Sequence, residues 1–289
     1  MSSPTVKTSG KLDEKQRRAL VSLLSDDDPA VHKTVRQKIL SYGPIAAQWV
    51  REHSLSNDPV LRRHAREISH YFSRQDADTQ LLAFCLNQGE EFDLEQGALL
   101  LARTQYPDIS IEAYRAWLDQ MAGDLRERLD LSGDAVPILN VIADYLFTEE
   151  KFTGDETNFH DPDNSYLNRV LDRRKGNHIS LCVVYLLVAR RLGLPVTGIG
   201  LPGYFVCRYQ SSRHELYIDP FRKGRLLSKA DCVKYVVQQQ HRFDDGCLSP
   251  VSARRILLRI CANLHQIYTH LRSPAQSERV QRYLVALAK

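Results

Sequence analysis

The sequence contains no long apolar run and no paired cysteines. Its apolar runs stay well short of the roughly 18 residues that a membrane-spanning helix requires, so we expect no membrane segment. None of the six cysteines forms a Cys-x-x-Cys pair, and most of them lie among apolar neighbours. That distribution is typical of neither a zinc site nor a disulfide framework. We therefore expect reduced, mostly buried thiols in a cytoplasmic protein.

An excess of charge of one sign is also missing. The formal net charge is +4 over 289 residues, and nucleic-acid binding usually needs a concentrated basic patch, so no nucleic-acid partner is expected. Residues 1–10, MSSPTVKTSG, lack the apolar core of a secretory signal and are predicted to be a disordered lead-in. One loop holds His160, Asp161 and Asp163 without any further ligand cluster, so we expect neither a metal site nor a cofactor.

Residues 11–130 are predicted to form a helical N-terminal region. Two similar segments each place an Asp-Pro pair, beginning at Asp28 and at Asp58, before a helix. Aspartate is a good N-cap residue, and proline is favoured at the first helical position. The likeness of the two segments is typical of HEAT-like helical repeats, and a plain helical bundle is the alternative.

Residues 131–250 are predicted to form a mixed core, and residues 251–289 a pair of helices. Directly after Pro195, the sequence VTGIGLPGYFVCRY alternates apolar and other residues around glycines, which indicates one or two strands. A further strand is predicted in HELYIDPF, which begins at His214. The order of helices, antiparallel strands and helices indicates an α+β fold with a small antiparallel sheet between helical flanks.

The most informative stretch runs from Asn164 to Pro195. It places a polar, basic turn directly before a strongly patterned helix, which Gly193 and Pro195 end. The first turn of a helix has free N–H groups and the positive end of the helix dipole, and a cysteine thiolate is stabilised there. This stretch therefore predicts a site at the N-terminus of the helix.

Three segments resemble the SirB1 family of transglutaminase-like proteins. The first is Asn164–Arg208, with its PGYF motif and the YIDPF that follows, and the second is Leu99–Leu129. The third, Arg259–Tyr268, is similar to the start of the tetratricopeptide-like (TPR-like) tail of that family. The resemblance implies a transglutaminase-like, papain-type core, and a bacterial cytoplasmic protein whose family is loosely linked to regulation.

The resemblance also implies where a catalytic triad would lie. In active transglutaminase-like proteins a cysteine at the start of the core helix is paired with a histidine on one strand and an aspartate on the next. Counting back from Gly193, the nucleophile position falls at His178, and the histidine position is Tyr204. A phenol ordinarily has a pKa of about 10, which makes it a poor general base at neutral pH. Only Asp219 is retained, so we expect a degenerate, non-catalytic core that serves as a binding, scaffold or regulatory module for an unidentified protein partner.

One alternative is a hydrolase or acyltransferase with a rearranged triad. Cys182 lies one turn after His178 on the same face of the helix, and Ser180 is close to the helix start. His214, in the predicted hairpin loop, would supply the imidazole and Asp219 the carboxylate. Against this alternative, the residues around Cys182 are typical of a buried core cysteine, a serine in the first turn is usually a cap, and a histidine at a loop tip is usually solvated.

The other alternative is an anion-binding regulatory module at the basic turn. A ligand site there would hold a carboxylate or phosphate beside the helix start. The candidate residues are Asn164, Arg169, Arg173, Arg174 and Lys175. The competing interpretation is an internal ion-pair network, in which Asp172 and Asp219 pair with Arg173 or Arg174.

Overall fold

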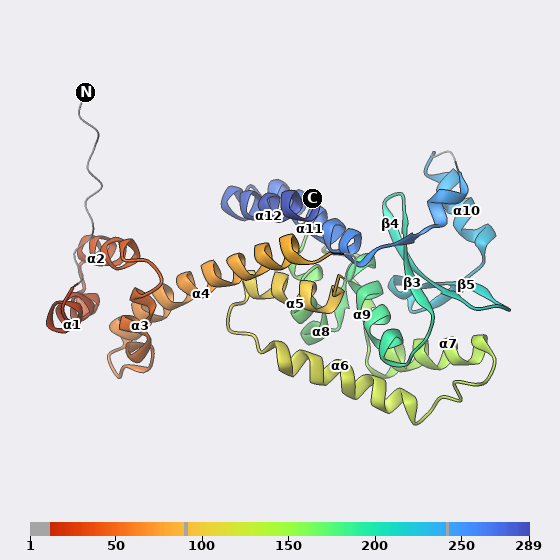
Figure 1. The fold of residues 1–289 in the computed structure, drawn as a ribbon, viewed down its shortest axis with the longest axis horizontal. Coiled ribbons are helices and arrows are strands. Elements are labelled where there is room, and N and C mark those ends of the chain that lie inside the picture. The colour runs from red at the N-terminus through yellow and green to blue at the C-terminus, as the bar shows by residue number, and fades with distance from the viewer. Residues whose placement is uncertain (1–11, 90–91, 241–242) are drawn as a thin grey trace. The chain divides into compact units, whose positions relative to one another are not determined.

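The structure is a computed structural model and describes residues 12–89, 92–240 and 243–289. The chain divides into two compact units, Met1–Asp78 and Thr79–Lys289, and the boundary falls inside the long helix α4 (Pro59–Asn87). The predicted boundary near residue 130 does not coincide with this division, because the helices between residues 94 and 126 belong to the second unit. The predicted lead-in of residues 1–10 lies outside the described residues. Figure 1 shows the elements of each unit.

The first unit is helical and has its own apolar core. Besides the first part of α4 it contains α1 (Glu14–Ser22), α2 (Pro29–Ser41) and α3 (Ala46–Arg51). The predicted cap at Asp28 is present, because its carboxylate accepts a hydrogen bond from the backbone N–H of Ala30 at 2.8 Å. Asp58 accepts equivalent bonds at the start of α4. The buried side chains are Val21, Leu24, Val35, Ile39, Ala46, Val50, Leu61, Ala65, Ile68 and Phe72. Whether these helices form HEAT-like repeats stays a prediction.

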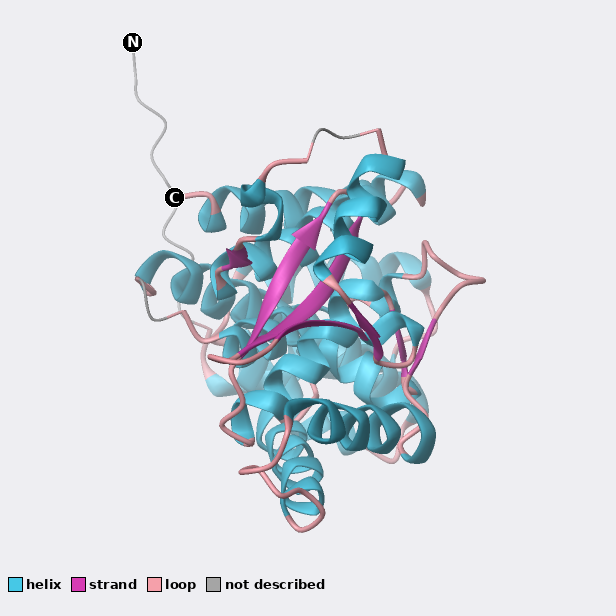
Figure 2. Ribbon diagram, turned by 90° about the vertical axis from the view of Figure 1, so that its right-hand side faces the viewer, coloured by secondary structure: helices cyan, strands magenta, loops and turns pink. Residues whose placement is uncertain are grey.

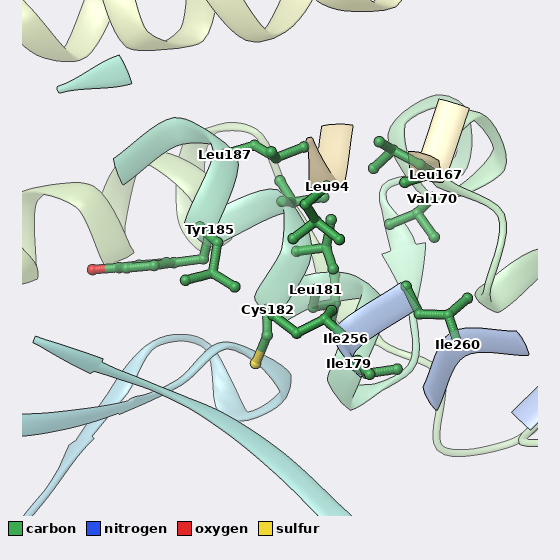
Figure 3. Close-up of a cluster of buried hydrophobic side chains, with 14 of the residues drawn as sticks. Leu94, Leu167, Val170, Ile179, Leu181, Cys182, Tyr185, Leu187, Ile256 and Ile260 are labelled. Carbon is green, nitrogen blue, oxygen red and sulfur yellow. The ribbon is translucent and has the colours of Figure 1, made fainter. Parts of the chain in front are cut away.

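The second unit is built around helix α9 (His178–Arg191), in which every residue from His178 to Ala189 is buried. A helix that is apolar on all sides must be covered on all sides. The other helices described in this unit are α5 (Leu94–Gln105), α6 (Ile111–Arg126), α7 (Ala135–Asp144), α8 (Leu167–Arg173), α10 (Lys229–Gln238), α11 (Ala253–His270) and α12 (Pro274–Leu287). Figure 3 shows how side chains from α5, α8, α9 and α11 meet in this core.

Helix α7 ends in a wide turn of π type, Tyr145–Glu149. A short parallel pair, β1 (Thr153–Gly154) and β2 (Lys175–Gly176), then ties the following loop to the residues just before α9. Among the described residues no helix is long and apolar enough to cross a membrane.

The main sheet is antiparallel and has the strand order β6-β5-β4-β3-β7. Helix α9 packs on β3 and β4, and α10 contacts β5 and β6. Figure 2 shows the strands, in magenta, among the helices. Along β4 the side chains alternate: Phe205 and Cys207 join the core around α9, whereas Val206 joins a smaller cluster with Cys232 and Val236 of α10. The predicted α+β class is confirmed. The strands are β3 (Val196–Leu201), β4 (Tyr204–Gln210), β5 (Glu215–Asp219), β6 (Arg225–Leu227) and β7 (Pro250–Val251).

Two glycines give a matched test of this fold. Gly224 has φ +73°, and a Cβ there would lie 2.6 Å from Cβ of Ala143 and 2.9 Å from the Phe147 ring. Gly224→Ala should therefore lower the free energy of unfolding by about 2 kcal/mol or more. A Cβ at Gly123, inside α6, would meet no neighbouring side chain within 4 Å. Gly123→Ala should therefore raise the free energy of unfolding by about 0.5–1 kcal/mol. Urea denaturation measures both, and equal effects would contradict the packing described.

Candidate functional site

The start of α9 is closed by its own cap. The Asn177 side chain accepts hydrogen bonds from the backbone N–H groups of Ile179 (3.1 Å) and Ser180 (3.0 Å), and the Ser180 hydroxyl accepts one from the N–H of Asn177. The same hydroxyl donates to the carbonyl of Asn164 at 2.6 Å. Ser180 is therefore a buried capping residue, which is the ordinary role expected for a first-turn serine.

The three predicted triad positions do meet in space. The ring of His178, at the start of α9, lies 5.1 Å from the ring of Tyr204, at the start of β4. The Tyr204 hydroxyl donates to the carboxylate of Asp219, at the end of β5, with distances of 3.0 and 3.2 Å to the two oxygens. The register predicted from the sequence thus brings together one imidazole, one phenol and one carboxylate.

The electrostatics of these groups oppose acid–base catalysis near neutral pH. Burial, and after it the nearby positive charge of Arg259, lowers the pKa of His178 to about 4, so this imidazole is neutral at pH 7. Burial and then the negative Asp219 raise the pKa of Tyr204 far above its ordinary value, so its hydroxyl stays protonated. Burial also raises the pKa of Asp219, although the hydrogen bond from Tyr204 works in the opposite direction.

Cys182 lies inside the core, one helical turn after His178. It is fully buried, and its sulfur points towards the strands (Figure 3), where the thiol donates to the carbonyl of Phe205 at 3.5 Å. Burial, followed by the contact with Cys207, raises the pKa of Cys182 well above that of a free thiol. A thiol in this environment is not an activated nucleophile.

His214 lies in the hairpin loop between β4 and β5. Its Nε2 is 3.4 Å from the carboxylate of Asp134, at the start of α7. Since β5 rises about 3.3 Å per residue, His214 lies roughly 16 Å along the strand from Asp219. The structure therefore does not assemble Cys182 or Ser180 with His214 and Asp219 into a rearranged triad.

The basic turn before α9 is internally paired. Arg169 contacts Asp163 at 2.9 Å, and Arg173 contacts Asp161 at 2.7 Å. Both acids belong to the loop that also contains His160, and in the structure they are the ion-pair partners of these arginines. The contacts therefore agree with an internal ion-pair network and not with an open anion site at this turn.

The partners of the remaining candidates complete this network. Arg174 contacts Glu150 at 2.6 Å and lies 4.1 Å from the centre of the Trp117 ring. Lys175 contacts the buried Asp155 at 3.2 Å, and the amide of Asn164 donates to the same carboxylate. The partners predicted for Arg173 and Arg174 were wrong: Asp172 lies 3.6 Å from Arg169, and Asp219 accepts from Tyr204.

A cavity of about 200 Å³ opens beside His178. Arg259 of α11 lines this cavity and was not among the candidates from the sequence. Its Nη2 donates to the backbone carbonyls of Leu201 (2.9 Å) and Tyr204 (2.8 Å). The signal that could have revealed it is a polar stripe at positions 259, 263 and 266, which share one face of a helix. The lining residues are Phe159, His160, Asn177, His178, Gly203, Arg259, Asn263, Gln266 and Ile267.

The carboxylate position opens to a different cavity. Tyr204 and Asp219 line a space of about 210 Å³, together with Arg222, Arg225 and residues of α10. His178 is absent from that lining, and Tyr204 and Asp219 are absent from the lining beside His178. A substrate in either cavity would therefore contact only some of the three positions His178, Tyr204 and Asp219.

The sequence matches the family described as transglutaminase-like superfamily over residues 112–262, more than half of the chain. The chain belongs to this superfamily.

Three relatives show the range of similarity. A UPF0162 protein of Xylella fastidiosa (strain 9a5c) is 35% identical over 187 residues, which cover 63% of this chain and 66% of that protein. A UPF0162 protein of Pseudomonas aeruginosa is 30% identical over 197 residues, which cover 66% of this chain and 70% of the relative. Human F-box only protein 21 is 25% identical over 235 residues, 70% of this chain but only 36% of that protein. No solved structure matches.

The lowered pKa of His178 predicts a pH-dependent stability. Its pKa is about 4 in the folded protein, against 6.5 for a free side chain, so between these values the unfolded state binds more protons. The stability that depends on the neutral ring is fully present above pH 6.5 and is lost as the pH falls towards 4. Between pH 7 and pH 5 the free energy of unfolding should fall by about 2 kcal/mol more in the unsubstituted protein than in His178→Gln.

Urea denaturation at the two pH values measures this difference. His214→Gln is the control, because it removes a histidine from a half-exposed loop and leaves His178 in place. The same loss of stability in His178→Gln as in the unsubstituted protein would show that the ring does not titrate as described.

Proposed function

We propose that the protein is a non-catalytic transglutaminase-like protein of the SirB1 type, whose core serves as a binding, scaffold or regulatory module. One observation carries the proposal. At the place where the superfamily's nucleophile would lie, the chain has a buried neutral imidazole, His178, beside Tyr204, whose hydroxyl is hydrogen-bonded to Asp219.

The chemistry of acyl transfer needs a nucleophile, a base that accepts its proton and a group that orients the base. Tyr204 stands in the place of the base but holds its own proton. The orienting carboxylate of Asp219 is occupied by that hydroxyl. The nearest thiol in the helix, Cys182, is buried against β4. At these positions the core thus keeps the fold of the superfamily without an exposed thiol and without an imidazole next to Asp219.

A binding role is supported by the helical flanks. Apolar side chains are exposed on the first unit, where Leu55 is 82% and Ile45 is 57% exposed, and on α12, where Val285 is 58% exposed. A contiguous exposed apolar surface marks a site of contact with another protein, so these side chains are the first places to look for one. The expected setting is the bacterial cytoplasm, with the TPR-like pair α11 and α12 and the N-terminal helices as the contact surfaces.

The proposal predicts that the protein has no thiol-dependent acyl transfer. With an activated ester such as p-nitrophenyl acetate, and with amine incorporation into a glutamine peptide, turnover should equal that of buffer and should not change in Cys182→Ala or Ser180→Ala. Native alkylation with iodoacetamide, read by mass spectrometry, should modify the half-buried Cys247 before the buried Cys182. Turnover that is lost in folded Cys182→Ala would sink the non-catalytic assignment.

A restoration variant tests the register of the former triad. His178→Cys combined with Tyr204→His places a thiol and an imidazole at the two changed positions, next to the retained Asp219. We expect alkylation of residue 178 to be at least about tenfold faster in this double variant than in His178→Cys alone, because a neighbouring imidazole lowers the pKa of a thiol. Equal rates in two folded proteins would mean that these positions do not face each other.

A further inference from the structure

We propose that the cavity beside His178 binds a small oxyanion, the carboxylate or phosphate group of a small molecule, and that Arg259 is its cationic anchor. The inference rests on the proposed function in one respect, namely that this cavity no longer serves catalysis. It also places the anion site at Arg259 on α11 and not at the basic turn before α9.

The first observation is a positive charge without a counter-ion. Arg259 is half-buried, and no carboxylate lies within ion-pair distance of it in the described ranges 12–89, 92–240 and 243–289. One of its nitrogens, Nη2, is taken by the carbonyls of Leu201 and Tyr204. A guanidinium has five N–H donors, so others remain for a ligand. A partly desolvated cation gains much from an anion that matches its planar fork.

The second observation is an unpartnered buried nitrogen on a residue that lines the same cavity. His178 is only 6% exposed, and its Nδ1 has no hydrogen-bond partner among the described residues. Buried polar atoms normally find a partner, and a neutral imidazole can donate from either nitrogen according to its tautomer. A rotation of the ring towards an oxyanion on Arg259 would give this nitrogen an acceptor.

The third observation is the size and lining of the cavity. Its volume of about 200 Å³ suits a small molecule. Asn263 and Gln266 lie one and two turns after Arg259 on the same face of α11 and add amide groups. Phe159 and His160 are exposed at the edge of the cavity, while His178 lies buried.

The basic turn before α9 offers a contrast within the same molecule. Arg169, Arg173 and Arg174 each have an acidic partner within 3 Å. Their charges are already balanced, so a ligand would have to displace an ion pair. Arg259 has no such competitor among the described residues, and this difference selects it as the anion site.

Isothermal titration calorimetry on the full chain, at constant ionic strength, tests the proposal with inorganic phosphate, acetate and succinate as probes. We expect saturable binding of at least one probe. Arg259→Gln should weaken it by about tenfold or more, since it removes a charge-assisted hydrogen bond. Binding of phosphate alone would assign the site to phosphate groups, and binding of acetate or succinate alone would assign it to carboxylates.

A second variant decides the question if Arg259→Gln fails to fold. Asn263→Asp is nearly isosteric and places a carboxylate one turn from Arg259, where it supplies an internal counter-ion. Affinity for the probe should again fall by about tenfold or more. The controls make the same change of charge elsewhere: Arg213→Gln in the hairpin loop and Asn140→Asp on the exposed side of α7. Both should bind as the unsubstituted protein does.

Two results would overturn the oxyanion site. One is the absence of saturable binding of all three probes to the unsubstituted protein. The other is binding that folded Arg259→Gln or folded Asn263→Asp leaves unchanged. Neither result bears on the absence of catalysis, which the esterase and amine-incorporation measurements test separately, so the two proposals can fail independently.

Discussion

The burial of α9 from His178 to Ala189 is the constraint on which the second unit depends. A helix whose first turn is buried must obtain partners for its first N–H groups from inside the protein, and Asn177 and Ser180 supply them. Through the Ser180 hydroxyl the cap reaches Asn164, and from there the buried Asp155 and Lys175. The loop before the helix is therefore ordered by the same polar contacts that allow the helix to be buried.

This constraint explains how a transglutaminase-like fold is kept with a histidine at the start of α9. The packing of α9 on β3 and β4 depends on apolar side chains along the helix, and none of these contacts needs a thiol at position 178. At the strand side, Tyr204 keeps the Asp219 carboxylate hydrogen-bonded, which a buried carboxylate requires. The tyrosine at this position thus leaves the buried Asp219 with a partner.

Much of this arrangement could be predicted from the sequence. The alternation after Pro195 predicted strands, and the register of the family motif predicted that His178, Tyr204 and Asp219 would meet. The sequence did not predict Asp161 and Glu150 as partners of the arginines, because an irregular loop has no period from which facing residues can be read. Arg259 was missed for a related reason: its contacts depend on α11 packing against the turn of the β3–β4 hairpin, which local patterns do not encode. The HEAT-like and TPR-like assignments remain predictions.

The wide turn that ends α7 sets the direction of two acids, Glu149 and Glu150, that form ion pairs with arginines elsewhere in the chain. A π-type turn holds one residue more than an α-helical turn, and each residue advances a helix by about 100°. With Tyr145–Glu149 in this form, Glu149 reaches Arg128 and Glu150 reaches Arg174. A relative with one residue fewer at this point would keep a regular helix and turn both acids away from their partners. Insertions and deletions in this short segment are therefore expected to coincide with changes at positions 128 and 174.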